Sequence, residues 1–297
     1  MTVMRSRTVD AGPIPIRLIT FNIRYATRGP SPGEELWSVR CPKLCAQLKF
    51  IASSHSSVFV CLQEVLHSQL LDIQAELGPS WSHIGQGRED GKEAGEFSPI
   101  FFRPGTWRCE LNKTYWLSST PEVPSRGWDA ALERVVTMGL FRHKSSGAAA
   151  IVMATHMDHL GRTAREESAK LLLTLAQRWV DRVGSDDARP SVFLGGDFNS
   201  TPDDLAYKAL TAPGVGMTDI SRLVPAAEHY GNLEFTYTSF GEPNETPKRI
   251  DFLFVREPQG IKFSTFGILS NRFDDGVYLS DHRAVVADVE IPASGSA

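Results

Sequence analysis

Cysteine is scarce in this chain of 297 residues, which has only four: Cys41, Cys45, Cys61 and Cys109. They form no CxxC pair and no spacing typical of a zinc site, and their arrangement suggests no disulfide framework. Cys61 lies within the apolar run 58–62, where a thiol packs as a small core residue. The few cysteines therefore argue against a disulfide-stabilised protein and favour a reducing compartment.

Long apolar runs and an excess of basic residues are also missing. No run approaches the roughly 18–20 apolar residues that span a bilayer, and residues 1–15 lack the apolar core of a secretory signal. We expect a soluble, intracellular monomer without a membrane span; a chain truncated after a removed signal is the alternative. The formal net charge of −4 argues against a global basic field for nucleic acid, although a local cleft needs only a few Lys or Arg to contact phosphates.

The composition is that of an ordinary globular protein, and no repeat or interdomain linker interrupts the chain. We expect one domain at residues 14–292, with a flexible N-terminal tail at 1–13 and a C-terminal tail at 293–297. The glycine-rich, charged segment 85–95 is expected to be an exposed loop. Strands outnumber helices and many are separated by them, which favours two sheets with outer helices. Apolar periodicity predicts helices at 39–53, 68–77, 163–183 and 203–210, and strands at 16–21, 57–62, 81–84, 96–102, 134–141, 148–154, 250–255, 261–269 and 284–289.

A further apolar run begins at Ser191, breaks at Gly195 and Gly196, and delivers Asp197 and Asn199 just beyond it. A carboxylate and an amide in a strand-to-helix loop are common features of catalytic sites. Asp and Asn are also frequent turn formers, so a structural role is the alternative for this stretch alone.

Polar clusters adjoin six apolar runs, and strand ends on one side of a sheet converge in space. Several carboxylates, two or three imidazoles and two carboxamides suit a hard cation such as Mg²⁺ together with acid and base groups. Singly, each cluster has a structural alternative: a solvated carboxylate, a core histidine or a turn cap. Six together are hard to explain as accidents. The clusters are Thr20-Phe21-Asn22, Gln63-Glu64, Thr155 to His159, Gly195 to Asn199, Arg249-Ile250-Asp251 and Ser280-Asp281-His282.

The cluster at Thr155 to His159 also invites a dinuclear zinc interpretation. The H-x-H-x-D-H signature of the metallo-β-lactamase fold would require a histidine at position 154, where this chain has Ala154. One missing ligand, with few Cys or His partners elsewhere, removes most of the support for zinc.

The ordered motifs Leu62-Gln63-Glu64, Thr155-His156, Gly196 to Asn199, Arg249-Ile250-Asp251 and Ser280-Asp281-His282 resemble those of the endonuclease/exonuclease/phosphatase superfamily. The resemblance covers about positions 16 to 290 and is closest to an uncharacterised microbial branch. It implies an α/β fold of the deoxyribonuclease I type: a four-layer sandwich of two mixed β-sheets packed face to face, with helices on the outside.

Residue roles follow from the resemblance motif by motif. It implies that Glu64 is the principal Mg²⁺ ligand, assisted by Asn22 and Asp281, and that Mn²⁺ substitutes. Asp197 would orient and deprotonate the attacking water, and Asn199 would hold that water or a phosphoryl oxygen.

The histidines and their partners complete the implied site. His156 and His282 would stabilise the phosphoryl charge, with Asp251 pairing with His282 and Glu96 with His156. Arg134 resembles a phosphate-contacting arginine. The loops 85–95, 118–129, 241–248 and 269–279 are expected to border the site. Trp128, in the second of them, is a candidate for stacking on a base, with a packing anchor as the alternative. Whether one or two metal ions act, and whether Asp or His is the general base, stays open.

The leading hypothesis is a Mg²⁺-dependent phosphodiesterase that uses in-line attack of water, with nucleic acid as the expected substrate. The alternative is a phosphomonoesterase or an inositol or phospholipid phosphoesterase with the same site residues. A third hypothesis is a binding protein that keeps the fold without catalysis; the competent residue at every motif position argues against it.

Overall fold

The computed structural model describes residues 12–183, 189–231 and 234–293. The predicted N-terminal tail lies outside these residues except for positions 12 and 13, and the predicted C-terminal tail lies outside them except for Ala293. Within the described part of the chain, every helix is too short or too polar to cross a membrane.

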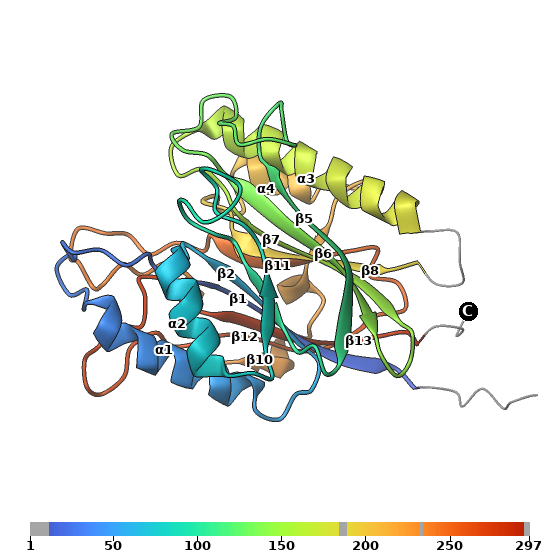
Figure 1. The fold of residues 1–297 in the computed structure, drawn as a ribbon, viewed down its shortest axis with the longest axis horizontal. Helices are drawn as coiled ribbons and strands as arrows, with labels where there is room; N and C mark the ends of the chain where they lie inside the picture. The colour runs from blue at the N-terminus through green and yellow to red at the C-terminus, as the bar shows by residue number, and fades with distance from the viewer. Residues whose placement is uncertain (1–11, 184–188, 232–233, 294–297) are drawn as a thin grey trace, which may run out of the picture.

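Two mixed β-sheets pack face to face, with helices on the outer side of each (Figure 1). The first sheet contains, in spatial order, β10 (His229–Tyr230), β12 (Lys262–Ile268), β13 (Val285–Ile291), β1 (Ile14–Asn22), β2 (Val58–Gln63), β4 (Ile100–Phe102) and β3 (Ser82–Ile84). The second contains β5 (Trp107–Trp116), β6 (Val135–His143), β7 (Ala149–His156), β8 (Ser191–Asp197), β11 (Asp251–Arg256) and β9 (Thr218–Asp219).

The helices form the two outer layers. Apolar residues of α1 (Trp37–Ala52) and α2 (His67–Leu77) share a buried cluster with the first sheet, and those of α3 (Arg162–Val183) and α4 (Leu205–Leu210) share one with the second. Two 3-10 turns, η1 (Ile220–Arg222) and η2 (Ala226–Glu228), lie in the segment before β10. This arrangement confirms the predicted four-layer α/β sandwich.

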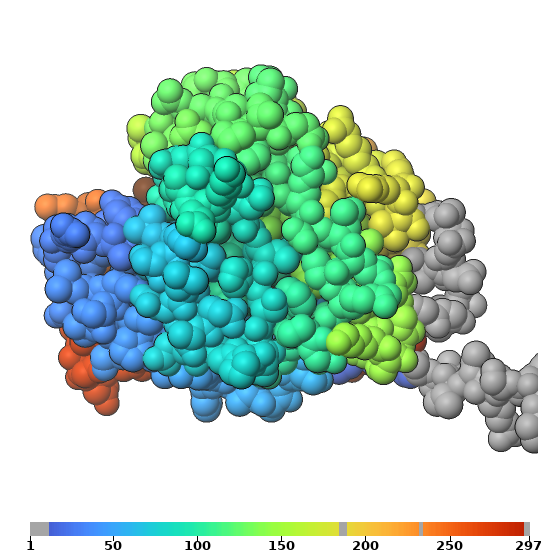
Figure 2. Space-filling view, in the orientation of Figure 1, coloured from blue at the N-terminus to red at the C-terminus, as the bar shows by residue number. Residues whose placement is uncertain are grey.

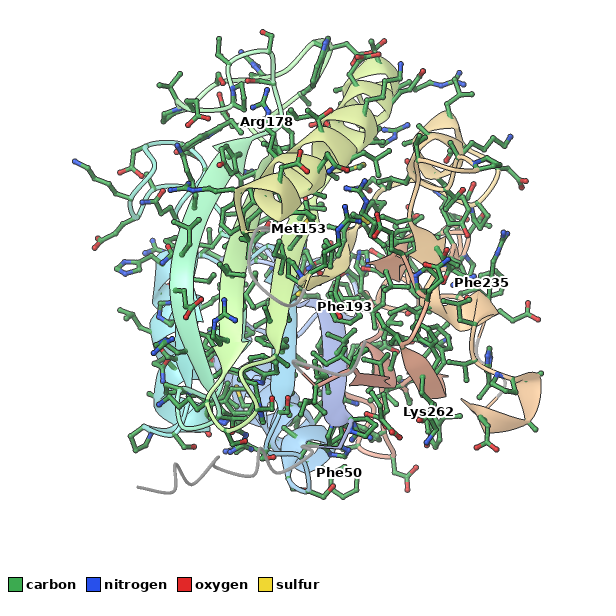
Figure 3. All side chains as sticks on the ribbon, turned by 90° about the vertical axis from the view of Figure 1, so that its right-hand side faces the viewer. Phe50, Met153, Arg178, Phe193, Phe235 and Lys262 are labelled. Carbon is green, nitrogen blue, oxygen red and sulfur yellow. The ribbon has the colours of Figure 1, made fainter. Side chains whose placement is uncertain are left out.

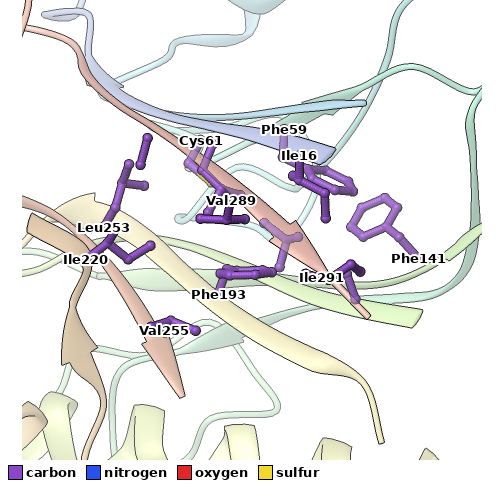
Figure 4. Close-up of a cluster of buried hydrophobic side chains, with 14 of the residues drawn as sticks. Ile16, Phe59, Cys61, Phe141, Phe193, Ile220, Leu253, Val255, Val289 and Ile291 are labelled. Atoms are coloured by element: carbon purple, nitrogen blue, oxygen red, sulfur yellow. The ribbon is translucent and has the colours of Figure 1, made fainter. Parts of the chain in front are cut away.

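The core between the sheets is aliphatic and aromatic (Figure 4). Phe59 on β2 meets Phe141 on β6 with 4.7 Å between ring centroids. Successive side chains of a strand point to opposite faces of the sheet. On one face of the second sheet, Phe193 of β8 belongs to the inter-sheet cluster; on the other face, Met153 of β7 packs beneath α3 (Figure 3). Both faces of the central strands are therefore buried, as in sheets covered on both sides.

Two glycines allow β8 to approach its neighbours closely. A Cβ at Gly195 would lie 3.1 Å from Leu253 and 3.3 Å from Cys61, and one at Gly196 would lie 2.4 Å from the carbonyl oxygen of Thr155. Since real Cβ atoms do not approach a backbone oxygen so closely, a larger residue at Gly196 would push β8 away from β7. The glycines before Asp197 therefore fix the position of that carboxylate.

The structure contains two short strands that were not predicted, β9 and β10, and it forms the predicted strand 96–102 only at Ile100–Phe102, as β4. It also differs from the prediction at β5 and in the segment 85–95. Strand β5 was not predicted, because this edge strand carries Arg108, Glu110 and Lys113, and its register shifts between Cys109 and Leu111, which breaks the apolar alternation. The segment 85–95, in teal at the surface in Figure 2, was predicted to be exposed, yet the Arg88 side chain turns inward and the residue is only 7% exposed. Arg88 is buried because it pairs with Glu96.

Candidate active site

Neighbouring strand ends bring the predicted site residues to one edge of the two sheets. His156 on β7 pairs in register with Asp197 on β8, which in turn pairs with Asp251 on β11. In the first sheet, Asn22 is the last residue of β1 and pairs with Gln63, the last residue of β2. Glu64 follows Gln63 directly in the sequence. The convergence expected from the sequence is present in the fold.

These residues surround a cavity of about 510 Å³. Most of its wall is polar, and it contains five carboxyl groups, two arginines and one lysine. Its lining residues are Arg24, Tyr25, Glu64, Glu96, Leu132, Arg134, His156, His159, Asp197, Asn199, Tyr237, Glu245, Lys248, Ile250, Asp281 and His282. A concave polar site of this size accommodates a small molecule.

Backbone strain is concentrated at this cavity. Among the described residues, six other than glycine have a positive φ, and three of these line the cavity: Arg24 at 58°, Glu64 at 59° and Asn199 at 46°. Such conformations cost of order 1–3 kcal/mol each and persist only where the surroundings enforce them. The strain supports a functional role for these positions.

Asp197 lies at the centre of the site and is buried. Its Oδ2 accepts a hydrogen bond from Asn22 Nδ2 at 3.0 Å and lies 3.5 Å from His156 Nε2 and 3.6 Å from His282 Nε2. Its Oδ1 accepts from the backbone N–H of Asn199 at 2.9 Å. Burial and the charge of Asp251 raise the pKa of Asp197 to about 7, against the opposing effect of His282. A carboxylate with such a pKa suits proton transfer near neutral pH.

His282 is held by a direct carboxylate contact. Its Nδ1 lies 2.8 Å from Asp251 Oδ2, and both side chains are buried. Burial opposes its protonation, but Asp251 and Asp197 outweigh burial and hold the pKa of His282 well above the ordinary value. His282 is therefore an imidazolium at neutral pH, in the pair that the resemblance implied.

His156 has a different environment. Its Nδ1 is 3.9 Å from Glu96 Oε2, too far for a hydrogen bond, and Glu96 pairs instead with Arg88 at 2.7 Å. Burial and the charges of Arg134 and Arg88 hold the pKa of His156 well below its usual value. Burial and the charge of Glu64 raise the pKa of Glu96 to about 7, against the pull of Arg88. His156 is therefore a neutral imidazole, and the expected Glu96–His156 pair is indirect.

Glu64 and Asp281 place two carboxylates on the cavity wall. Glu64 accepts from Asn22 Nδ2 at 2.9 Å and from the N–H of Tyr25 at 3.2 Å, and it lies 3.9 Å from Arg24. Burial would raise the pKa of Glu64, but these hydrogen bonds and the charges of His282 and Arg24 lower it.

The pKa of Asp281 shifts in the opposite direction. Burial and the nearby charge of Glu64 raise the pKa of Asp281. Two neighbouring carboxylates, one of them destabilised by the other, are relieved by a cation between them. Oxygen donors of this kind fit Mg²⁺.

Two other features bear on cation binding. Asn22 bridges Glu64 and Asp197 through its amide nitrogen, while its Oδ1 accepts from the N–H of Arg24 at 3.0 Å. Separately, Asp197, Asp251 and His282 offer ligand atoms that all lie within 4.8 Å of one another, so this buried group could also hold a metal ion. Since Asp251 and His282 already hydrogen bond to each other, the Glu64–Asp281 pair is the more available of the two groups.

Arg134 and Trp128 lie at different depths. Arg134 lines the cavity; its Nε donates to Asp158 at 3.3 Å and its Nη2 lies 3.0 Å from His159 Nδ1. Trp128 is 43% exposed, has a φ of 48° and is not among the residues that line the cavity. Leu132, four residues further along the same loop, contributes to the wall instead.

Several lining residues were not singled out in the sequence. Arg24 and Tyr25 follow Asn22 directly, so their proximity to a predicted ligand was a usable signal. Glu245 and Lys248 lie in the loop 241–248, which was expected to border the site, although neither residue was singled out. Tyr237 comes before that loop, in a segment without apolar periodicity, and only the fold places it here. Backbone hydrogen bonds anchor this segment, since Thr238 N donates to the carbonyl of Asp281.

The chain is similar to known proteins over most of its length. The model of the endonuclease/exonuclease/phosphatase family matches residues 19–282. A comparison with curated proteins gave no match.

Solved structures provide closer relatives. An endonuclease/exonuclease/phosphatase from Bacteroides vulgatus has 32% identity and a TM-score of 0.80, covering 93% of this chain and 99% of its own. A mannosyl-6-phosphatase from Bacteroides thetaiotaomicron has 31% identity and a TM-score of 0.78, covering 92% and 99%. D. rerio TDP2 complexed with a single-strand DNA product has 15% identity and a TM-score of 0.67, covering 93% and 98%, and shows similarity of fold alone.

Proposed function

The chain belongs to the endonuclease/exonuclease/phosphatase family, and from that premise we propose that it is a Mg²⁺-dependent phosphomonoesterase acting on a small hydroxylated phosphate ester. The observation that carries the proposal is the position of Asp197, buried between two imidazoles at the wall of the cavity. A carboxylate with a raised pKa beside a neutral and a charged imidazole provides a base and charge-stabilising donors for hydrolysis.

The charge of the cavity wall favours a small monoester over a nucleic-acid strand. Five carboxyl groups against four cationic side chains, counting the protonated His282, do not form the basic track that follows a polynucleotide backbone. Glu245 and Tyr237, joined by a 3.3 Å hydrogen bond, offer polar partners for substrate hydroxyl groups. The relative named as a mannosyl-6-phosphatase, at 31% identity, supports this choice. The nuclease that the sequence favoured is supported only by relatives that share the fold.

Glu64 and Asp281 would hold the metal ion, and Asn22 would fix Glu64 by the hydrogen bond described above. A bound Mg²⁺ supplies charge neutralisation for a nonbridging phosphoryl oxygen. Arg24, Arg134 and Lys248 line the same cavity and would offset the second negative charge of a monoester dianion.

Asp197 would accept the proton of the attacking water, whose oxygen forms the new bond to phosphorus as the bond to the ester oxygen breaks. The released ester oxygen takes a proton from solvent water to become the alcohol, and Asp197 returns its proton to solvent. Asn199 lines the cavity, and its amide nitrogen donates to the carbonyl of Met157 at 3.0 Å, which holds the side chain where it can position that water. His282, kept cationic by Asp251, would stabilise charge on the phosphoryl oxygens. The products are inorganic phosphate and an alcohol, and no enzyme side chain becomes covalently modified.

A matched substrate panel tests the proposal. With Mg²⁺ present, we expect kcat/KM for mannose 6-phosphate or glucose 6-phosphate to exceed that for a single-stranded DNA oligonucleotide by at least about 100-fold. p-Nitrophenyl phosphate should likewise be hydrolysed faster than bis-p-nitrophenyl phosphate. Faster cleavage of DNA and of the diester would overturn the monoesterase assignment in favour of a nuclease.

Two variants serve as the negative control and the matched control for that panel. Glu64→Gln removes a carboxylate from the proposed metal site and should lose nearly all activity on every substrate of the panel. Asp181→Asn makes the same type of change on the exposed face of α3, where Asp181 contacts only Gln177 among the hydrogen bonds of the described residues. It should retain the wild-type rate.

A further inference from the structure

A second, much smaller cavity lies behind His156. Its volume is about 10 Å³, which is the space that one water molecule needs. Its lining residues are Arg88, Glu96, Phe97, Ser98, Arg134, Val135 and His156. It shares Glu96, Arg134 and His156 with the large cavity, so it adjoins the side of the site opposite His282.

Three buried nitrogen atoms of these lining residues have no hydrogen-bond partner among the described residues: Arg88 Nε, Arg134 Nη1 and His156 Nδ1. Leaving a buried polar atom without a partner costs about 1–3 kcal/mol, and more for a charged group. Such atoms in native proteins are satisfied by ordered water when the site is polar and large enough. This cavity meets both conditions.

We propose that one ordered water molecule occupies this cavity and joins Arg88 and Arg134 to His156. The guanidinium groups can only donate, so Arg88 Nε–H and Arg134 Nη1–H fill both acceptor positions of the water. The water then has only its hydrogens to offer, and it donates one of them to His156 Nδ1. The imidazole proton is therefore on Nε2, facing Asp197 and the substrate cavity.

The alternative tautomer would have the proton on His156 Nδ1. In that state Asn199 Nδ2, 3.0 Å away, would donate to His156 Nε2. Three donors would then converge on a water that accepts two hydrogen bonds, and Nε2 would have no hydrogen for a phosphoryl oxygen. In the proposed state Asn199 Nδ2 and His156 Nε2 are both donors, and the Asn199 amide keeps only its hydrogen bond to the carbonyl of Met157. The water thus selects the tautomer in which His156 is a donor toward the site.

This assignment gives Arg88 a positioning role from a loop that the sequence marked as exposed. Its Nη1 donates to Glu96 Oε2 at 2.7 Å, and its carbonyl oxygen accepts from the Trp116 indole at 2.6 Å. Both ends of the residue are therefore fixed, which leaves Nε aligned on the water. Arg88 does not line the large cavity and acts on the substrate only through His156.

The direct test is a high-resolution crystal structure of the wild-type protein. We expect density for one water within hydrogen-bond distance of Arg88 Nε, Arg134 Nη1 and His156 Nδ1. A well-ordered structure with no density in the cavity, or with Glu96 bound directly to His156 Nδ1, would overturn the proposal. This readout needs no substrate, so it stands or falls separately from the proposed function.

Val135→Ile provides a functional test, because the added methyl group occupies the water position. The ¹⁵N spectrum of the His156 imidazole should move toward the Nδ1–H tautomer, and, if the proposed function holds, kcat should fall about 10-fold with little change in KM. Val136→Ile is the matched control: it adds the same methyl group one residue away, in the cluster that faces α3, and should leave the ¹⁵N signals of His156 unchanged.

Arg88→Lys gives a second way to remove the water contact if Val135→Ile does not fold. It keeps a positive charge for Glu96 but has no Nε–H for the water. We expect the same change in the His156 ¹⁵N signals as in Val135→Ile. A folded Arg88→Lys protein with the wild-type spectrum would contradict the role of Arg88.

Discussion

His156 and His282 lie at similar distances from the same oxygen of Asp197, 3.5 and 3.6 Å, yet they are supported in opposite ways. On the other side of the ring, His282 Nδ1 has the carboxylate of Asp251 at 2.8 Å, whereas the carboxylate that faces His156 Nδ1, that of Glu96, is 3.9 Å away and is paired with Arg88. The pKa of His282 is raised and that of His156 is lowered. One site therefore contains a charged and a neutral imidazole, set by their partners rather than by their distance from Asp197.

This difference separates two tasks. An imidazolium beside the phosphoryl group stabilises negative charge, and a neutral imidazole donates a hydrogen bond without adding a charge that would hold Asp197 in its ionised, weakly basic form. The raised pKa of Asp197, about 7, is consistent with only one of its two neighbours being cationic.

The largest effect is expected at Glu64, which is the carboxylate partner of neither histidine. Its loss of activity is the reference for the smaller losses expected at the partners of the two histidines. EDTA or Glu64→Gln should reduce kcat/KM by at least about 1,000-fold, because the proposed metal site loses its ion or its principal ligand. Calorimetry should show weaker Mg²⁺ binding by Glu64→Gln. If the wild-type protein were fully active at the same rate with and without Mg²⁺, the metal would have no role in catalysis.

Asp251→Asn should have the next largest effect. The amide keeps the shape of the side chain but cannot hold His282 as an imidazolium, and we expect kcat to fall by about 100- to 1,000-fold. Steady-state kinetics measure the loss, with Asp181→Asn as the same substitution at a remote position. A fall of less than about threefold would mean that the charge of His282 has no catalytic role.

Glu96→Gln should cost much less, about 10-fold in kcat, because Glu96 reaches His156 only indirectly. The informative quantity is the ratio of the loss of kcat in Glu96→Gln to the loss in Asp251→Asn. Glu290→Gln, whose carboxylate pairs with Lys262 on the far part of the first sheet, is the control and should have the wild-type rate. A larger loss in Glu96→Gln than in Asp251→Asn would reverse the assignment of the two histidines.

The smallest effect concerns stability on the His156 side. Burial opposes ionisation of Asp158, but hydrogen bonds from the N–H groups of Gly161 and Leu160 and the charge of Arg134 lower its pKa to about 2. A lowered carboxylate pKa stabilises the fold above the unfolded-state pKa and loses that contribution as pH falls toward the folded-state value. It amounts to about 2 kcal/mol at neutral pH, and roughly half should be lost by pH 3.

Urea unfolding of wild type and Asp158→Asn measures this contribution. The variant should be less stable at neutral pH, and the gap between the two proteins should narrow as the pH is lowered toward 3. A gap that stays constant over this range would show that Asp158 stabilises the loop without its charge.

Much of the fold could be predicted because its central strands are short apolar runs that end in polar residues. Asp197, Glu64 and His282 each follow or precede such a run, and five ordered motifs pointed to one family. Strand β5 escaped prediction because charged residues and a register shift obscure the alternation of an edge strand. The loop that contains Lys248 was expected near the site, but Tyr237 reaches the cavity from an aperiodic segment that no local pattern places.

The partners of the two histidines show a second limit of the sequence. Asp251–His282 and Glu96–His156 looked equivalent as carboxylate–imidazole pairs, and only the coordinates distinguish 2.8 Å from 3.9 Å. The cause is Arg88, whose inward orientation depends on the hydrogen bond between Trp116 of β5 and the loop, a contact between segments 28 residues apart. Burial of a charged loop residue is a tertiary effect that composition does not reveal.

The protonation states of the two histidines test the central claim most directly. In ¹⁵N-labelled protein near neutral pH, measured with and without Mg²⁺, His282 should have both ring nitrogens protonated and His156 should have one. Asp251→Asn should convert His282 to a neutral ring and leave His156 unchanged. Two histidines with the same protonation state, or a charged His156 beside a neutral His282, would contradict the account.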